Sequence, residues 1–468
     1  MTVTNNISRV YFIGIGGIGM SALARYFMQR NVIVSGYDRT PSEITTSLEK
    51  EGAMIHFEEN TELIDRAANL VVFTPAVPSE HKELVWYNTN GYSVKKRSEV
   101  LADVTREGFN ICISGTHGKT TTTTLTSFIL RESGMGCNAF LGGISVNYDT
   151  NYWGGDYKIN VVEADEYDKS FLRLSPDMAV ISAVDADHLD IYGDVGKMRD
   201  AYVDFAKRIR HEGFLLTKFG LQIPVGTFHN HLTYSLQNES ADIRGYDIRM
   251  EEGGYHFSIS GPGWRMKDFR IEMGGMHNVE NAIVAITLAF KCGVSEDKIR
   301  ESVAAFRGVK RRFEYIIGVK QARLNKNNVV FIDDYAHHPE ELRALLKGAK
   351  SLFNDRYITV IFQPHLYSRT RDLHEGFAEV LSMANQVILL PIYPARELPI
   401  EGITSELISL QIKNKRVSIV DRENLTEWIS EKYIPSLPNA LAGDVLITAG
   451  AGNIDRLVDP IKNKLLNQ

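Results

Sequence analysis

The sequence predicts an α/β fold with three domains, and three observations support this prediction. Short apolar runs of strand length alternate with helical segments along the whole chain, which is typical of folds with parallel sheets. The chain has 468 residues, and a domain commonly holds roughly 100–200 residues. Apolar residues make up 44% of the sequence and charged residues 24%, so the chain can bury several cores and is not expected to be disordered.

Composition argues against several classes of function. The 52 basic and 58 acidic side chains give a net charge of −6, which provides no general attraction to nucleic acid or to an anionic membrane. Cys112, Cys137 and Cys292 form no CxxC pair, so neither a disulfide framework nor a cysteine-based zinc site is expected. No signal-peptide pattern and no run of 18 apolar residues is visible. We therefore expect a cytoplasmic protein without nucleic-acid or membrane partners.

The first block of elements is expected within residues 1–107. An apolar strand at 10–15 leads into a glycine-rich turn and then a helix at about 20–30. Further buried strands are expected at 32–38 and 69–77. This alternation predicts one α/β domain.

A second block is expected within residues 108–312. It opens with a strand at 110–115, a second glycine-rich turn and a helix from about Lys119. Its further strands and helices are expected at 160–163, 178–184, 277–291 and 295–306. The stretch of about 215–275 alternates polar and apolar residues and contains many glycines, which predicts antiparallel strands with one face in solvent.

The third block is expected within residues 313–468. Its strands are expected at 329–333, 357–362, 386–390 and 444–448. The segments between them are long enough for helices, so the sequence predicts a third α/β domain.

The second glycine-rich turn, from Ser114 to Thr121, carries the clearest chemistry. Its sequence GTHGKTT lies between a buried strand and a helix, where backbone N–H groups and the helix N-terminus can hold phosphate oxygens. Lys119 can reach the β- and γ-phosphates of a nucleotide, and the Thr120 hydroxyl is placed to bind Mg²⁺. Ile113 replaces the first glycine of the longer GxxxxGK[ST] motif, so this loop is a shorter form. The motif predicts binding of a nucleoside triphosphate; the alternative is a glycine-rich turn with an incidental lysine.

Acidic side chains follow two further strands of the same block. Glu163 ends one strand and begins the run EADEYD, and His188 lies in the run DADHLD after the next strand. Carboxylates at such positions lie at the crevice where open α/β sheets bind ligands. An acid there can hold Mg²⁺ and His188 can supply a nitrogen ligand, although any one such acid is also typical of a surface turn.

The first glycine-rich turn matches GxGxxG, with glycines at Gly14, Gly16, Gly17 and Gly19 and with Asp38 at the end of the next strand. Taken alone it favours a dinucleotide cofactor and an NAD-dependent dehydrogenase. The helix N-terminus requires only a diphosphate, however, and a UDP-sugar supplies one equally well. Together, the two turns indicate two phosphate-bearing substrates, one in each domain.

Histidines and arginines follow two strands of the third block, in DDYAHHP at 333–339 and QPHLYSRTRD at 363–372. Such side chains suit recognition of a carboxylate or phosphate, although most arginines in a chain of this size lie at the surface. Arg311 and Arg312, near the second domain boundary, can reach the nucleotide from a hinge or lie in solvent. A metal site on the adjacent histidines is not expected.

Over almost its whole length the chain resembles the ATP-dependent Mur ligase family. The motifs that carry the resemblance are GIGGIGMS (14–21), GTHGKTTT (115–122), EADEYDKSF (163–171), DADHLDIYGD (185–194), HNVENA (277–282), RRFE (311–314), DDYAHHP (333–339), FQPHLYSRTRDL (362–373), YPARE (393–397) and AGAGN (449–453). The resemblance implies an N-terminal Rossmann-like domain for a UDP-sugar and a central P-loop ATPase-type domain. It also implies a C-terminal Rossmann-like domain that closes on ATP and an amino acid.

Within the family, the motifs are most similar to the type that joins L-alanine to the lactoyl carboxylate of UDP-N-acetylmuramate. This implies an ATP-dependent reaction through an acyl phosphate, with Mg²⁺ as cofactor, at the first amino-acid addition in peptidoglycan precursor synthesis. The implied partners are the small molecules ATP, UDP-N-acetylmuramate and L-alanine, and a monomer or weak homodimer is expected.

The resemblance also implies roles for individual residues. The ATP-binding residues are Gly115, Thr116, His117, Gly118, Lys119, Thr120, Thr121, His277, Asn278, Asn281, Arg312 and Asp333. The UDP-sugar-binding residues are Gly14, Gly16, Gly17, Gly19 and Asp38. The amino-acid-binding residues are Tyr335, His337 and Arg369, the metal positions are Thr120, Glu163 and His188, and the catalytic residues are Lys119, His188 and Arg369.

Two positions depart from the family pattern. Leu366 stands where relatives often carry an arginine, so part of the basic lining differs. Val203 and Phe205 stand near the position at which the sister ligases carry a carbamylated lysine, and Lys207 comes only later, so no carbamate is expected. Three alternatives stay open: a ligase that adds a preformed tripeptide, a nicotinamide dehydrogenase and a P-loop ATPase without ligation.

Overall fold

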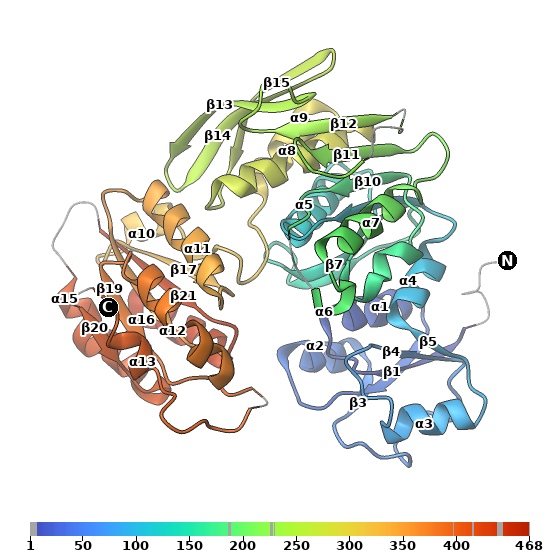
Figure 1. Ribbon diagram of the computed structural model, residues 1–468, viewed down its shortest axis with the longest axis horizontal. Helices are drawn as coiled ribbons and strands as arrows, with labels where there is room; N and C mark the ends of the chain where they lie inside the picture. The colour runs from blue at the N-terminus through green and yellow to red at the C-terminus, as the bar shows by residue number, and fades with distance from the viewer. Residues whose placement is uncertain are drawn as a thin grey trace. The chain divides into compact units, whose positions relative to one another are not determined.

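The structure is a computed structural model that describes residues 7–185, 189–224, 228, 230–395, 397–413, 416–437 and 443–467 (Figure 1). These residues form three β-sheets with helices between the strands, which confirms the predicted three-domain α/β class. The chain divides into two compact units, Met1–Tyr246 with Ser258–Phe269 and Glu280–Phe306, and Asp247–Phe257 with Arg270–Val279 and Arg307–Gln468. No helix within the described ranges is both long and apolar enough to cross a membrane.

The first sheet is parallel, with the strand order β3-β2-β1-β4-β5. Its strands are β1 (Arg9–Ile13), β2 (Ile33–Tyr37), β3 (Met54–His56), β4 (Leu70–Phe73) and β5 (Val94–Lys96). Its helices are α1 (Ile18–Met28), α2 (Glu43–Glu51), α3 (Lys82–Thr89) and α4 (Arg97–Thr105). The strand order changes direction at β1, which lies between β2 and β4. Open parallel sheets bind ligands at such a switch point, beyond the carboxyl ends of the strands, and the first glycine-rich turn follows β1 there.

The second sheet has the order β15-β14-β13-β12-β11-β10-β6-β9-β7-β8. Its strands are β6 (Phe109–Ser114), β7 (Asn138–Ser145), β8 (Thr150–Trp153), β9 (Ile159–Glu163), β10 (Met178–Ile181), β11 (Phe214–Lys218), β12 (His231–Ser235), β13 (Ile243–Glu251), β14 (Gly254–Gly261) and β15 (Trp264–Ile271). Its helices are α5 (Lys119–Glu132), the 3₁₀ segment η1 (Tyr167–Arg173), α6 (Leu189–Tyr192), α7 (Val195–Ala206), α8 (Met276–Lys291) and α9 (Glu296–Ala305). Ile113 of β6 lies opposite Glu163 of β9 and Val180 of β10 in parallel register. The segments that follow these three strands therefore leave the sheet at the same edge.

The antiparallel prediction for residues 215–275 is wrong for its first part. β11 pairs in parallel with both β10 and β12, and β12 pairs in parallel with β13. Two-residue connections join β13 to β14 and β14 to β15, as in β-hairpins. Alternation of polar and apolar residues reports that one face of a strand is solvated, and it does not report the direction of the strand.

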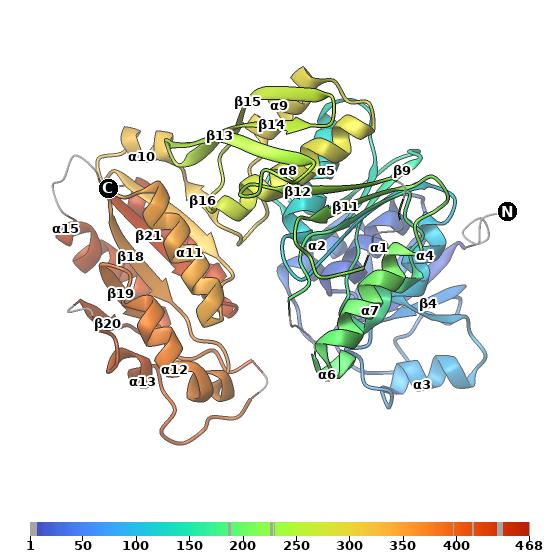
Figure 2. The ribbon, with the colours of Figure 1, turned by 45° about the horizontal axis from the view of Figure 1, so that its top comes forward.

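The third sheet has the order β16-β17-β21-β18-β19-β20, and β16 is its antiparallel edge strand. Its strands are β16 (Glu314–Ile317), β17 (Val329–Asp334), β18 (Tyr357–Phe362), β19 (Gln386–Leu389), β20 (Val417–Ile419) and β21 (Asp444–Ala449). Its helices are α10 (Val319–Leu324), α11 (Pro339–Leu352), α12 (Tyr367–Leu381), α13 (Glu406–Ser409), α14 (Leu425–Trp428), α15 (Ile434–Ser436) and α16 (Val458–Leu466). Helices α11 and α12 lie side by side along this sheet in both ribbon views (Figure 2). The ends of β17, β21 and β18 are in register, which brings the loops after them together.

The first two sheets share one hydrophobic core, which explains why they belong to one compact unit. Tyr26 of α1 packs against Phe140 of β7 and Tyr152 of β8, with ring centroids 5.7 and 6.1 Å apart. Buried Arg25 of α1 donates to the Asn151 side chain of β8. Helix α1, which follows the first glycine-rich turn, therefore packs on two strands of the sheet that carries the second turn.

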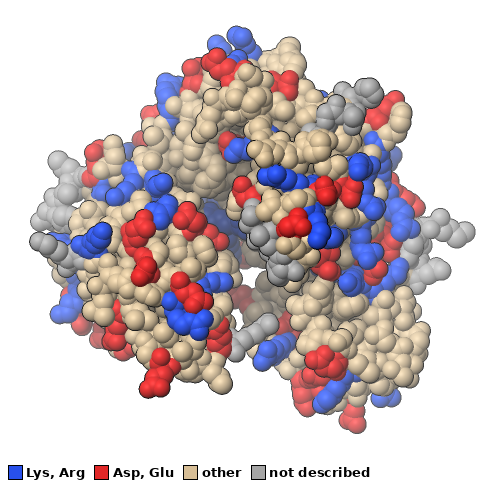
Figure 3. Space-filling view, viewed as in Figure 1, with Lys and Arg blue, Asp and Glu red and all other residues tan. Residues whose placement is uncertain are grey.

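Charges of both signs are interspersed on the visible surface (Figure 3). On this face Lys and Arg side chains lie among Asp and Glu side chains, with wide uncharged areas between them. The distribution agrees with the small net charge of the sequence.

Candidate active site

The loop between β6 and α5 has the backbone of a phosphate-binding loop. Gly115 and Gly118 have φ angles of +127° and +81°, which side-chain-bearing residues rarely adopt. A Cβ atom at Gly115 would lie 2.2 Å from Ser182 Oγ, and one at Gly118 would lie 2.5 Å from Asn281 Oδ1. Ser182 Oγ also donates to the carbonyl oxygen of His117 at 2.5 Å. Both glycines are thus required by this turn.

The first two residues of α5 each meet a carboxylate at or just past the end of β9. Lys119 Nζ donates to Glu166 Oε1 and to the carbonyl oxygen of Gly115, both at 2.8 Å. Thr120 Oγ1 donates to Glu163 Oε1 at 3.1 Å. Glu166 is 1% exposed and the Lys119 side chain 15%, so little water screens this ion pair. An ammonium group has three N–H donors, and these two contacts leave one for a phosphate.

The Thr120 hydroxyl and the Glu163 carboxylate are suitable ligands for Mg²⁺. Both are oxygen donors of the kind that Mg²⁺ prefers, and Mg²⁺ is usually held by one or two protein groups together with substrate phosphates. Among the described residues, no group of three or more His, Cys, Asp and Glu side chains could hold a metal alone. His188, the third predicted metal position and a predicted catalytic residue, lies outside the described residues.

The other side chains of the loop lie around it. Thr116 Oγ1 accepts the amide N–H of Asp185 at 3.2 Å, and His117 Nε2 lies 3.4 Å from Asp185 Oδ2 in solvent. Thr121 is buried within α5. The run of threonines that opens this helix is therefore packed inside the domain, in spite of its low helix propensity.

Asn281, predicted for the nucleotide site, lies directly beside the phosphate-binding loop. Its Oδ1 accepts from Thr122 Oγ1 at 3.2 Å, and the side chain is buried against Gly118. Asn278 instead donates to the carbonyl oxygen of Gly274 at 2.6 Å, and His277 is exposed. Contacts of these three residues with adenine stay a prediction.

The first glycine-rich turn is held by Asp38. The amide N–H of Gly16 donates to Asp38 Oδ2 at 2.7 Å, so this carboxylate stabilises the turn itself. Gly14 has a φ angle of +88°, and a Cβ atom at Gly16 would lie 2.8 Å from Asp38 Oδ2. A substitution at Gly16 would therefore disturb the turn as well as any diphosphate bound to it.

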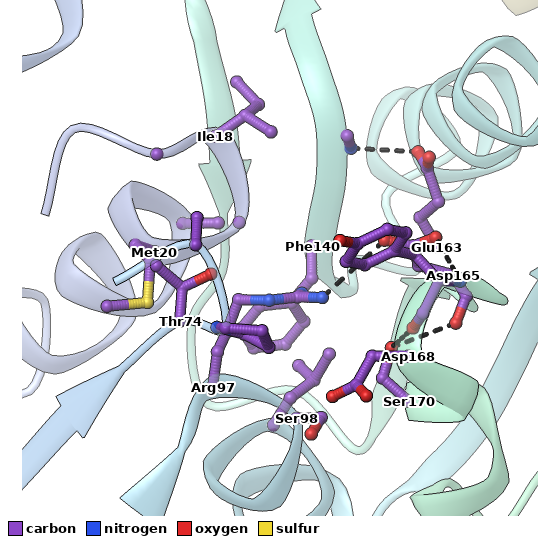
Figure 4. Close-up of a pocket in the computed structure, with 18 of the residues that line it drawn as sticks. Ile18, Met20, Thr74, Arg97, Ser98, Phe140, Glu163, Asp165, Asp168 and Ser170 are labelled. Carbon is purple, nitrogen blue, oxygen red and sulfur yellow. Dashed lines mark hydrogen bonds and ion pairs between the residues drawn. The ribbon is translucent and has the colours of Figure 1, made fainter. Parts of the chain in front are cut away.

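A cavity of about 330 Å³ lies between the start of α1 and the segment that follows β9 (Figure 4). Its lining includes Gly17, Ile18, Gly19, Met20, Thr74, Arg97, Ser98, Phe140, Glu163, Asp165, Asp168 and Ser170. Figure 4 shows Arg97 extending between Met20 and Thr74 on one side and Asp165 on the other. Of the five residues predicted for the UDP-sugar, all of them described, Gly17 and Gly19 line this cavity and Gly14, Gly16 and Asp38 do not. Glu163, which lines this cavity, also accepts the hydrogen bond from Thr120 of the phosphate-binding loop.

The three residues predicted for the amino acid lie together at the carboxyl edge of the third sheet. The rings of Tyr335 and His337 are 5.2 Å apart, and His337 faces His365 at 6.0 Å. Arg369 Nη1 lies 3.4 Å from His365 Nδ1, and His365 stacks on Tyr393 with ring centroids 5.7 Å apart. This cluster of two aromatic rings, two imidazoles and one guanidinium can hold a small zwitterion.

Burial lowers the pKa of His365 to about 4, and the neighbouring Arg369 and His337 lower it in the same direction. The imidazole is therefore neutral at pH 7 and adds no charge beside Arg369. Leu366, which precedes α12, has a φ angle of +70°, a strained conformation for a leucine. Its amide donates to the carbonyl oxygen of Tyr393 at 2.9 Å and fixes the chain next to His365.

Asp333, which is predicted for the nucleotide site, forms an ion pair with Arg311. Arg311 Nε lies 3.3 Å from Asp333 Oδ2, and Thr448 Oγ1 donates to Asp333 Oδ1 at 2.6 Å. Asp333 is 2% exposed, and burial raises its pKa to about 7 against the opposing effects of Arg311 and Thr448. Arg312 is exposed. Contacts of Arg312 and Asp333 with a nucleotide stay a prediction.

Sequence reasoning missed four residues that the structure places in these clusters: Arg97, Glu166, His365 and Tyr393. Three of these residues lie within motifs that the sequence analysis describes, namely Glu166, His365 and Tyr393. Their positions after strands could have suggested a role for each of them. Arg97 belongs to none of the motifs, and only the packing of α4 against α1 brings it into the cavity.

Three protein-family models match successive parts of the chain. The model described as the Mur ligase family, catalytic domain, matches residues 9–108, and the Mur ligase middle domain matches residues 113–289. The model described as the Mur ligase, glutamate ligase domain, matches residues 311–452. The three matched ranges follow one another along the chain without overlap.

Curated relatives match the chain over nearly its full length. A UDP-N-acetylmuramate–L-alanine ligase of Cytophaga hutchinsonii is 45% identical over 98% of this chain and 97% of its own length. The ligases of the same name from Porphyromonas gingivalis and Flavobacterium johnsoniae are 44% and 43% identical, covering 98% and 99% of this chain and 99% of their own. A solved UDP-N-acetylmuramate–alanine ligase from Thermotoga maritima aligns with a TM-score of 0.80 at 26% identity, over 97% of this chain and 98% of its own.

Proposed function

The chain belongs to the Mur ligase family, and from that premise we propose that it joins L-alanine to the lactoyl carboxylate of UDP-N-acetylmuramate in the cytoplasm, with ATP and Mg²⁺. Relatives that share 43–45% of its sequence carry that activity in their names. One structural observation supports the proposal most strongly. A single cavity runs from the first glycine-rich turn to Glu163, whose carboxylate is hydrogen-bonded to Thr120 of the phosphate-binding loop.

The proposed chemistry activates a carboxylate, which is a poor acyl donor. An oxygen of the lactoyl carboxylate attacks the γ-phosphorus of ATP, so that an acyl phosphate forms and ADP leaves. The nitrogen of L-alanine, after its ammonium group has lost a proton, attacks the carbonyl carbon. The bond from that carbon to the phosphate oxygen then breaks, phosphate leaves, and the nitrogen loses its second proton as the amide forms.

The residues of this chain mainly position the reactants and balance charge. Lys119 offers its remaining N–H donor to the transferred phosphoryl group. Thr120 and Glu163 would hold Mg²⁺, which would neutralise phosphate charge. Arg369 binds the carboxylate of L-alanine through a charge-assisted contact, and neutral His365 packs beside it without competing for that carboxylate.

Phosphate release by the purified protein tests this proposal. With ATP, Mg²⁺ and UDP-N-acetylmuramate, we expect L-alanine to support turnover and a preformed tripeptide to fail. Turnover with the tripeptide in place of L-alanine would instead assign the chain to the tripeptide-adding ligases. Phosphate release that does not depend on the UDP-sugar would indicate an ATPase. An absorbance change with NAD(P)H would indicate a dehydrogenase.

A further inference from the structure

Arg97 is a largely buried cation without a hydrogen-bonded partner among the described residues. It is the first residue of α4, lines the cavity, and has a side chain that is 21% exposed. The nearest carboxylate oxygen in the described part of the chain is Asp165 Oδ2 at 3.8 Å, which is beyond hydrogen-bond distance. A guanidinium group presents five N–H donors, and those of Arg97 lie at the wall of the cavity, where they are accessible to an anion. The position of Arg97 therefore indicates an anion that enters the cavity.

Gly19 lies directly against the Arg97 side chain. It lies in the first turn of α1 and does not have a positive φ angle, so its backbone conformation does not require glycine. Alanine would favour the helix by about 1 kcal/mol. A Cβ atom at Gly19, however, would lie 2.8 Å from Arg97 Nη1, 3.0 Å from its Cδ and 3.2 Å from its Cζ. The missing side chain makes room for Arg97 to lie across the first turn of α1.

The neighbouring Gly17 provides a contrast. A Cβ atom there would make only ordinary contacts, at 3.4 Å from the carbonyl oxygen of Gly14 and 3.6 Å from Met20 Cγ. The tight approach of Arg97 is therefore specific to the position of Gly19.

We propose that Arg97 holds the diphosphate of the UDP-sugar against the start of α1, and that Gly19 is a glycine because Arg97 must lie there. This inference rests on the proposed function. The start of α1 contributes N–H groups and the positive end of the helix dipole, and the guanidinium fork matches two phosphate oxygens. Asp165 lies on the opposite side of the guanidinium and keeps it directed across the cavity. The carboxylates of Glu163, Asp165 and Asp168 disfavour a second anion at the other end of the cavity unless a metal ion is bound there.

Binding of UDP and of UDP-N-acetylmuramate, measured by calorimetry without ATP, tests this proposal. Arg97→Ala is expected to weaken binding of both ligands by about tenfold or more, and Arg97→Lys by less, because the charge remains but the fork is lost. Gly19→Ala is expected to weaken binding by a similar factor while its Tm stays at or above that of the unmodified protein. The double variant is expected to bind about as weakly as either single variant, because both changes remove the same contact.

Arg173→Ala is the matched control. Arg173 of η1 pairs with Glu99 of α4 at 3.2 Å, so it also joins α4 to the segment that follows β9, but it is half-exposed and outside the cavity lining. Its removal is expected to leave binding of both ligands unchanged.

The possible outcomes separate this inference from the proposed function. If the unmodified protein binds neither UDP nor UDP-N-acetylmuramate, the proposed function fails and the inference fails with it. If the unmodified protein binds both but Arg97→Ala or Gly19→Ala binds equally well, the inference alone is overturned. A loss confined to UDP-N-acetylmuramate would also overturn it, because Arg97 would then contact the lactoyl carboxylate. If the double variant loses affinity by the product of the two single-variant factors, Gly19 and Arg97 act separately and the inference is overturned.

Discussion

At the scale of single residues, Lys119 and Glu166 form the most consequential pair. Glu166 is almost fully buried, and its second carboxylate oxygen has no hydrogen-bond partner among the described residues. The carboxylate consequently depends on Lys119 for its charge balance. Lys119 thus has two roles, one in binding phosphate and one in stabilising the central domain.

Replacing Lys119 should separate these roles. Lys119→Ala is expected to abolish phosphate release while UDP-sugar binding survives, because the diphosphate meets a different helix. It should also destabilise the protein by about 3–5 kcal/mol, since it leaves a buried carboxylate without its cation. Thermal unfolding and phosphate release measure the two effects. Adding Glu166→Gln should restore most of the stability and none of the activity; recovery of activity would show that Lys119 is not needed for the chemistry.

Arg369 carries the prediction for amino-acid binding. L-Alanine has almost no side chain, so its carboxylate is the main group that can be recognised. Arg369→Lys keeps the positive charge but loses the planar guanidinium group with its paired N–H donors. It should raise the KM for alanine by about tenfold or more, equivalent to at least about 1.4 kcal/mol. The KM values for ATP and UDP-sugar should change little. A raised KM for ATP with an unchanged KM for alanine would move Arg369 to the phosphate site.

How well sequence reasoning predicts a residue depends on the range of the interaction that defines its role. Gly115, Gly118, Lys119 and Thr120 act through one local turn, and the motif identified them correctly as its parts. Arg97 enters its cluster only because distant elements pack together, and no local pattern reports such packing. Arg311 likewise meets Asp333 only because the fold brings another strand beside it, so no local pattern predicts this ion pair.

At the scale of elements, the phosphate-binding loop is stabilised by its contact with α8. Gly118 has a positive φ angle and also lies against Asn281, so both backbone strain and a close contact exclude a side chain. Gly134, just after α5, has a similar φ angle of +85° with open space around it. The two glycines therefore differ mainly in the contact with Asn281.

Alanine substitutions at the two glycines should separate strain from contact. Gly134→Ala should destabilise the protein by roughly 1–2 kcal/mol through the left-handed conformation alone and leave nucleotide binding unchanged. Gly118→Ala should destabilise it further and weaken ATP binding, because the loop must move away from Asn281. Thermal unfolding and nucleotide titration measure both effects. Equal effects of the two substitutions on stability and on ATP affinity would show that the contact with Asn281 does not hold the loop.

The existence and order of the elements were largely predictable, whereas pairing between strands was not. Strand β6, helix α5 and four strands of the third sheet, β17, β18, β19 and β21, occur where periodicity and turn residues placed them, whereas β16 and β20 were not predicted. The parallel pairing of β11 with β12 was mispredicted, since its direction is set by the chain path between the strands. That information is absent from the alternation of residue types within each strand.

At the scale of the whole molecule, buried acids should give the stability a specific pH dependence. Burial raises the pKa of Asp444 from its ordinary value of 3.8 to about 7, although Tyr433, the Val445 amide and Thr359 all donate to it. Burial also raises the pKa of Asp333. Between about pH 4 and pH 7 these two carboxyl groups therefore hold more protons in the folded protein than in the unfolded chain, and their contribution to stability falls as pH rises.

Asp444→Asn should reduce this fall, because the side chain no longer ionises. The measurement is the free energy of unfolding from denaturant titrations at pH 5 and pH 8, compared as a difference for each protein. This difference should be smaller in Asp444→Asn than in the unmodified protein, whatever the variant's overall stability. An unchanged difference would mean that Asp444 is ionised throughout this range.

The most direct measurement of the central claim follows one oxygen atom. If the lactoyl carboxylate attacks ATP and L-alanine then displaces phosphate, one carboxylate oxygen must leave with the phosphate. UDP-N-acetylmuramate labelled with ¹⁸O in that carboxylate should therefore transfer a single ¹⁸O atom to the released phosphate at each turnover, detected by mass spectrometry. Phosphate that carries no label from the substrate and instead takes its new oxygen from labelled water would contradict the ligase account and indicate hydrolysis of ATP.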